Sequence, residues 1–145
     1  MSDLQIVFDP LPSDALSSLV RDNVLSYGVA RSGASDWHPV GFFLKSPRGE
    51  WLGGLIAYIW GGWLHVNFLW VSETLRGQGH GSRLMDAAEA LARQRGASAA
   101  TVETFTYQAP GFYAKRGYVV FGRLDEYPPG HAKLFLRKDL IPGRT

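Results

Sequence analysis

Residues 71–84, Val-Ser-Glu-Thr-Leu-Arg-Gly-Gln-Gly-His-Gly-Ser-Arg-Leu, place three alternating glycines between an apolar segment and an amphipathic one. Glycine permits tight backbone turns and leaves the neighbouring N–H groups accessible to a ligand. The first N–H groups of a helix also lack intrahelical partners and carry partial positive charge. A strand-to-helix turn of this composition therefore predicts a backbone cradle for a phosphate or pyrophosphate.

The spacing of these glycines excludes two common phosphate-binding loops. A P-loop requires a Gly-Lys pair, and none occurs anywhere in the chain. The dinucleotide fingerprint requires a third glycine at position 82, where Ser82 stands. A plain structural turn before a capped helix remains an alternative, so a second motif is needed.

Two motifs together provide a resemblance. Arg76-Gly77-Gln78-Gly79-His80-Gly81 resembles the pyrophosphate-binding loop of the GNAT acyltransferase superfamily, which reads Arg/Gln, two residues, Gly, one residue, Gly/Ala. Further along, Phe112-Tyr113-Ala114-Lys115-Arg116-Gly117-Tyr118 resembles the later GNAT motif of Phe/Leu-Tyr, Glu/Ala-Lys, one residue, Gly-Phe/Tyr. The order and separation of the motifs agree, and the resemblance spans residues 40–138. The chain departs from the common pattern at Thr106 and Gln108, where many members have Asn and a small residue.

Periodicity predicts strands through the centre of the chain. Residues 51–72 contain no Asp, Glu, Lys or Arg, and this uncharged run is long enough for a membrane span. However, Gly61-Gly62 is typical of a two-residue hairpin turn between segments 51–60 and 63–71. In the second segment, the polar residues His65 and Asn67 alternate with apolar residues, as in a strand. We therefore predict two antiparallel strands rather than a membrane helix. The other predicted strands are residues 4–8, 40–45, 100–105, 118–123 and 133–138, and the predicted helices are residues 13–27, 83–95 and 109–116.

Hairpins followed by strand, helix and strand predict a mixed sheet. The resemblance implies an α/β (α+β) fold with a mostly antiparallel central sheet flanked by helices. It also implies that the sheet is splayed between the strand ending at Val71 and the strand ending near Phe105, with acyl-CoA in the gap.

Composition limits the class of protein. With 145 residues, of which 46% are hydrophobic, the chain suits one domain, and the resemblance makes residues 1–145 a single acyl-CoA N-acyltransferase domain. The absence of cysteine excludes disulfides, thiolate metal sites and a cysteine nucleophile, and we expect no metal. A net charge of +2 gives no argument for nucleic acid, and the N-terminus lacks a secretory pattern. We expect a cytoplasmic protein without membrane association, and leave open whether it forms a homodimer.

The resemblance implies acetyl-CoA as co-substrate. Backbone N–H groups of the glycine loop are expected to bind its pyrophosphate, and the edge of the preceding strand its pantetheine amides. For Arg76, a phosphate contact and a capping role in the turn are equally good interpretations. The expected acetyl-CoA contacts are Leu69, Trp70, Val71, Arg76, Gly77, Gln78, Gly79, His80, Gly81, Ser82 and Thr106.

The expected chemistry is transfer of acetyl to a primary amine by direct attack. Tyr113 stands in the general-acid position of the family, where a phenol protonates the departing thiolate, with a core tyrosine of the short helix as the alternative. The ammonium must also lose a proton, and His65 is the first candidate for the base, with a structural histidine as an equal alternative. It shares a predicted strand face with Asn67. Another candidate for the base is Glu103. For Glu73 a supporting role beside the glycine loop is favoured over the base, and for His131 an exposed loop position is favoured.

The resemblance therefore predicts an acetyl-CoA-dependent N-acetyltransferase that acts on a small-molecule amine. An acetyltransferase for a protein or peptide amine is one alternative. A non-catalytic acyl-CoA-binding or regulatory module is the other, although binding alone does not require a phenol at the sulfur. The sequence does not identify the amine.

Overall fold

The computed structural model describes residues 3–34 and 36–142. The chain divides into two units, residues 1–35 and residues 36–145. Within the described residues, no helix is both long enough and apolar enough to span a bilayer.

Among its described residues, 3–34, the first unit contains one helix, α1 (Asp14–Ser32). The Ser13 side chain caps it by accepting a hydrogen bond of 3.1 Å from the N–H of Leu16. The helix ends at Gly33, whose φ of 71° is accessible to glycine. It therefore continues beyond its predicted end, because Gly28 does not interrupt it. The predicted strand over residues 4–8 is wrong, since this stretch forms no ladder with any described strand.

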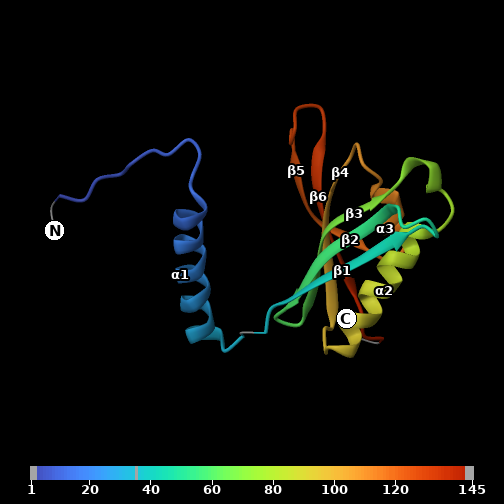
Figure 1. Ribbon diagram of the computed structural model, residues 1–145, viewed down its shortest axis with the longest axis horizontal. Coiled ribbons are helices and arrows are strands. Elements are labelled where there is room, and N and C mark those ends of the chain that lie inside the picture. Colours follow the sequence, from blue (N-terminus) through green and yellow to red (C-terminus); the bar gives the residue numbers. More distant parts are fainter. Residues whose placement is uncertain (1–2, 35, 143–145) are drawn as a thin grey trace. The chain divides into compact units, whose positions relative to one another are not determined.

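The second unit is built on a six-stranded sheet (Figure 1). The order is β1-β2-β3-β4-β6-β5, and only β3 and β4 run parallel to each other. The strands are β1 (His38–Lys45), β2 (Trp51–Trp60), β3 (Trp63–Val71), β4 (Ala99–Phe105), β5 (Val119–Asp125) and β6 (Ala132–Asp139). The hairpin predicted at Gly61-Gly62 is confirmed, with φ of 60° and 85° at the two glycines.

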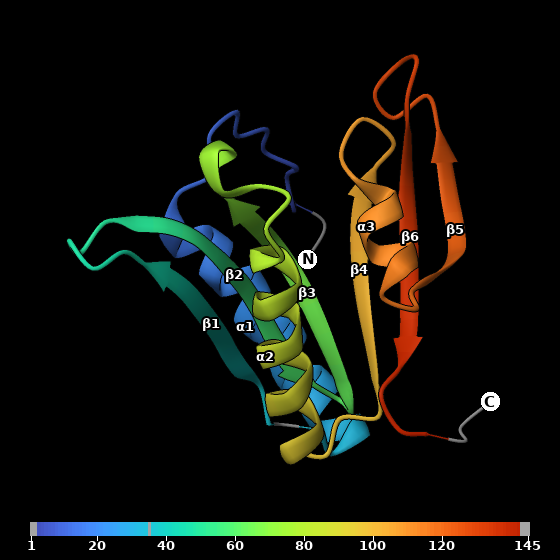
Figure 2. The same cartoon turned by 90° about the vertical axis from the view of Figure 1, so that its right-hand side faces the viewer.

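Two helices lie on one face of this sheet. Figure 2 shows α2 (His80–Gln94) over β1, β2 and β3, and α3 (Pro110–Lys115) over the other half of the sheet. The main core lies between α2 and the sheet, where Leu55, Leu64 and Met85 are fully buried. Gly96, with φ of 85°, follows the end of α2 as predicted.

The sheet separates between β3 and β4 (Figure 2). Their parallel pairing extends only from Trp63↔Ala99 to Val66↔Val102. Beyond this point β3 stays paired with β2 and β4 stays paired with β6, so the two halves diverge. The predicted α/β (α+β) class, with a mostly antiparallel sheet splayed between the strands ending at Val71 and Phe105, is confirmed.

A β-bulge in β3 lies where the separation begins. Ile56 pairs with Phe68, whereas the next residue, Ala57, pairs with Val66, so Asn67 is an extra residue. After the bulge, Leu69 and Val71 pack against the core. Strict alternation would place Phe68 and Trp70 there instead. His65 and Asn67 therefore do not belong to one regular strand face, contrary to the prediction.

Candidate active site

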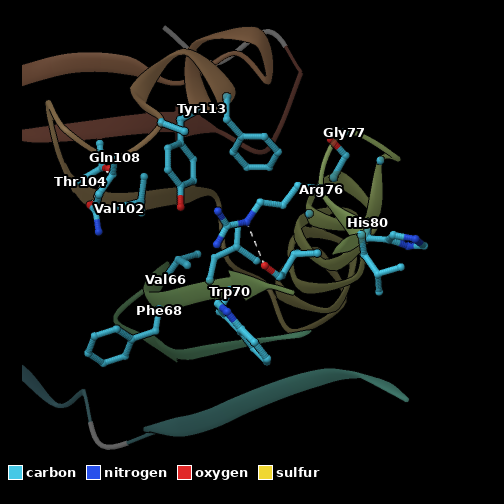
Figure 3. A pocket seen from close by; sticks show the side chains of 18 of the residues that line it. Val66, Phe68, Trp70, Arg76, Gly77, His80, Val102, Thr104, Gln108 and Tyr113 are labelled. Atoms are coloured by element: carbon cyan, nitrogen blue, oxygen red, sulfur yellow. Dashed lines mark hydrogen bonds between the residues drawn. The ribbon is translucent and has the colours of Figure 1, made fainter. Parts of the chain in front are cut away.

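A cavity of about 930 Å³ occupies the gap between β3 and β4 (Figure 3). Its walls come from β3, the glycine loop, the first turn of α2, β4 and α3. Among the sequence-predicted residues, those that line it are Leu69, Trp70, Val71, Arg76, Gly77, Gly79, His80, Gly81, Ser82 and Tyr113. The structure thus places residues of both distant motifs around one space.

The glycine loop has the backbone geometry of an anion cradle. Gly77 and Gly79 have φ of 78° and 84°, in the left-handed region that favours glycine. Gly79 caps α2, whose first turn has neither a side-chain cap nor an acidic residue. The N–H groups at the start of this helix are therefore left for an external acceptor.

Gly81 is constrained by space rather than by its torsion angles. A Cβ atom at this position would lie 3.4 Å from two ring atoms of Phe112, and 4.0 Å from Val71. One methyl group fits there at van der Waals distance, but a branched side chain extends into the contact between α2 and α3. This explains why a Gly/Ala choice at this position suits the loop, whereas Gly79 requires glycine.

The polar side chains of the loop are partly engaged within it. Arg76 Nε donates a hydrogen bond of 3.2 Å to the carbonyl of Val71, and Figure 3 shows the guanidinium extending into the cavity. Gln78 Nε2 donates to the carbonyl of Thr74 at 3.3 Å. Arg76 thus caps the turn and also places positive charge in the cavity, whereas Gln78 is not among the residues lining the cavity.

Tyr113 reaches the cavity from α3, and Figure 3 shows its hydroxyl pointing into it. The residue is 8% exposed, and its ring packs edge-on against Phe112 and Tyr118, at centroid distances of 5.1 and 5.8 Å. Burial raises the pKa of the Tyr113 hydroxyl, because the phenolate is poorly solvated there. The phenol therefore retains its proton at neutral pH.

Besides Gln78, two other predicted site residues do not line the cavity. His65 is half-buried; its Nδ1 lies 3.0 Å from the Tyr58 hydroxyl, and the two rings stack at 4.9 Å. Thr106 bridges to Ala132: its N–H donates to the Ala132 carbonyl at 2.9 Å, and its Oγ1 accepts from the Ala132 N–H at 3.0 Å. The Thr106 side chain is therefore part of a connection to β6.

Sequence reasoning missed Thr104 as a cavity residue. It is buried, lines the cavity, and donates to Gln108 Oε1 at 3.0 Å. The same Oε1 accepts the N–H of Phe105 at 2.9 Å, so Gln108 closes the turn after β4. Alternation supplied a signal, because Ala100, Val102 and Thr104 share the buried face of the strand.

Charge is distributed unequally around the cavity. Arg76 lies at the cradle, whereas Glu103 is the one carboxylate among the described lining residues. Lys133 Nζ lies 2.9 Å from Glu103 Oε2 and forms an ion pair with it. The hydrogen bond to Glu103 raises the pKa of the Lys133 ammonium. No group of three potential metal ligands occurs within the described part of the chain.

Comparisons with known proteins agree with this geometry. A sequence model of the Acetyltransferase (GNAT) family matches residues 11–118. A blasticidin-S acetyltransferase of Streptomyces morookaense is 47% identical over 94 residues, which are 64% of this chain and 69% of that protein. An acetyltransferase of Agrobacterium fabrum is 33% identical over 119 residues, or 82% of this chain and 87% of the relative. A crystal structure of a Bacillus cereus acetyltransferase superposes with a TM-score of 0.81 at 27% identity, covering 92% of this chain and 97% of the other. The chain belongs to the GNAT family of acetyltransferases.

Proposed function

We propose that this chain acts as one acyl-CoA N-acyltransferase domain over residues 1–145. It transfers acetyl from acetyl-CoA to a primary amine of a small molecule, by direct attack in a ternary complex. One observation carries the proposal: the glycine cradle and the Tyr113 hydroxyl line the same cavity. An anion site alone would be enough for a protein that only binds acyl-CoA. A buried, protonated phenol in the same cavity can in addition protonate a leaving group, which an enzyme requires.

Binding of acetyl-CoA divides between the loop and the strand. The backbone N–H groups from Gln78 to Ser82 are the proposed donors to the pyrophosphate, assisted by the Arg76 guanidinium. The segment Leu69–Val71 lies beyond the last residue of β3 that pairs with β4. Its unpaired edge is suited to the amide groups of pantetheine and to the oxygen of the thioester.

The transfer requires one acid and one base. The amine lone pair attacks the thioester carbonyl carbon to form the C–N bond, and negative charge develops on the carbonyl oxygen. Collapse of this adduct breaks the C–S bond, and the thiolate takes the proton of the Tyr113 hydroxyl. The proton lost by the amine passes to a base, and the Tyr113 phenolate then regains a proton from solvent.

We propose His65 as the base. Because His65 does not line the cavity, the proton of the amine reaches its imidazole through an intervening water. To accept a proton at Nε2, the imidazole must carry its other proton on Nδ1 and donate it to the Tyr58 oxygen, 3.0 Å away. The stacked Tyr58 ring restricts the orientation of the imidazole. This pairing is therefore compatible with a proton acceptor held in one orientation.

The amine is proposed to approach from the Glu103 side of the cavity. Glu103 is the one carboxylate among the described lining residues and, although it pairs with Lys133 at 2.9 Å, it is the group there that favours an ammonium. A small molecule is favoured over a protein amine because the relative from Streptomyces morookaense is named for blasticidin-S. The class of acceptor proposed here is thus a cationic small-molecule amine.

A thiol-release assay with acetyl-CoA tests the proposal directly. The acceptors should include blasticidin-S, polyamines, aminoglycosides, amino acids and peptides, with mass spectrometry of the products. We expect thiol release to depend on a small amine and to yield its N-acetyl product. Activity with peptides alone would favour the protein-modifying alternative. Binding of acetyl-CoA without release for any amine would favour the non-catalytic one.

A further inference from the structure

Glu89 is a charged residue buried in the interior of the second unit. It lies on α2 and is 2% exposed. Its carboxylate accepts hydrogen bonds from Tyr118 Oη at 2.9 Å, Lys138 Nζ at 2.7 Å and Arg116 Nη2 at 3.2 Å. The partly exposed Arg93 places its Nη2 3.9 Å from Glu89 Oε1. Because burying a carboxylate is costly without partners, these contacts together hold the charge in place.

Arg116 connects this carboxylate to the acetyl-CoA cradle. It immediately follows α3, and its side chain is 12% exposed. It donates to the Ser82 carbonyl at 3.3 Å, to Asp86 at 2.7 Å and to Glu89. The three acceptors lie on successive turns of α2, beginning with the turn that lines the cavity. One guanidinium thus fixes the end of α3 along α2.

The same residues hold Tyr113. The N–H groups of Arg116 and Tyr118 both donate to the Tyr113 carbonyl, each at 3.0 Å. The Tyr118 ring also packs edge-on against the Tyr113 ring. Two of the three residues that donate side-chain hydrogen bonds to Glu89 therefore also bind Tyr113 through their backbones.

We propose that Glu89 is a positioning residue that holds the Tyr113 hydroxyl at a fixed place relative to the glycine cradle. The inference rests on the proposed function, in which Tyr113 acts as the acid. With six residues, α3 is too short to define its own position, so its place depends on tertiary contacts. Loss of the carboxylate leaves the half-buried cations of Arg116 and Lys138 without their shared acceptor. Arg116 then keeps only the Ser82 carbonyl and the exposed Asp86, so the position of α3 is held less firmly.

The test compares Glu89→Gln with Asp86→Asn in steady-state kinetics. Both variants remove a carboxylate that pairs with Arg116, but the Asp86 side chain is 71% exposed. We expect Glu89→Gln to lower kcat by about 10- to 100-fold, since a displacement near 1 Å has effects of that size. Its KM for acetyl-CoA should change far less, and Asp86→Asn should leave kcat within about twofold of the wild-type value.

A double-mutant cycle with Tyr113→Phe separates positioning from general stability. If Glu89 acts through the phenol, Glu89→Gln should cause no further loss of kcat once the hydroxyl is absent. An equal loss in both backgrounds would overturn the inference, as would wild-type kcat in folded Glu89→Gln. Tyr118→Phe, which removes one hydrogen bond, provides the same cycle if Glu89→Gln does not fold. Full activity of Tyr113→Phe would instead refute the acid assignment in the proposed function, and this inference with it.

Discussion

Replacing Gly79 by alanine should weaken acetyl-CoA binding without any steric clash. A Cβ atom at this position meets nothing within 4 Å, so the whole effect comes from the backbone φ of 84°. A left-handed conformation costs a non-glycine residue about 1–2 kcal/mol. If the loop relaxes to avoid this cost, the cradle is lost and affinity should fall by about 5- to 30-fold.

Gly81→Ala is the matched control. It adds the same methyl group two residues later, at a helical position without a left-handed φ, and the new Cβ lies at ordinary contact distance from Phe112. Alanine also favours the helix by about 1 kcal/mol relative to glycine. Calorimetry with acetyl-CoA should therefore give an affinity within about twofold of wild type for Gly81→Ala, but a clear loss for Gly79→Ala and for Gly81→Val. Equal affinities for folded Gly79→Ala and Gly81→Ala would refute the reasoning.

Two further predictions concern titratable groups. If His65 takes the proton of the amine, His65→Ala should lower kcat/KM with little change in acetyl-CoA affinity. An unaltered kcat/KM would leave His65 with only its packing against Tyr58. Burial, together with the neighbouring Glu89, raises the pKa of the Tyr118 hydroxyl in the folded state. The resulting contribution to stability is fully present below the pKa of the unfolded state, about 10, and is lost as the pH rises above it. Tyr118→Phe should accordingly show a smaller fall in Tm than wild type between pH 9 and 11, and parallel curves would contradict this.

Local sequence signals were sufficient for the parts of the fold that depend on local geometry. The Gly61-Gly62 turn was predictable because both residues need positive φ, and the cradle because Gly79 does. Residues 4–8 were mispredicted because β-propensity does not specify a partner strand.

The β-bulge at Asn67 has no comparable signal in the sequence. Apolar residues at positions 64, 66, 68 and 70 alternate regularly, so the prediction kept one face throughout the strand. The actual inward residues after the bulge are Leu69 and Val71, which are also apolar. A one-residue change of phase is therefore invisible when both faces carry apolar side chains.

The buried network around Glu89 was also beyond sequence reasoning. In the sequence, Glu89 belongs to the polar side of an amphipathic helix, as Asp86 does. Its partners Tyr118 and Lys138 lie 29 and 49 residues away along the chain. Only the tertiary arrangement distinguishes the buried carboxylate from the exposed one.

The central claim is that the Tyr113 hydroxyl protonates the leaving thiolate in the cavity that binds acetyl-CoA. Single-turnover kinetics of Tyr113→Phe, saturated with acetyl-CoA and with an amine accepted by the wild-type protein, test it most directly. The substitution retains the ring that packs against Phe112 and Tyr118. We predict a loss of rate on the order of a hundredfold with unchanged acetyl-CoA affinity, and a smaller loss for a thioester with a more acidic thiol. A wild-type rate in Tyr113→Phe would contradict the claim.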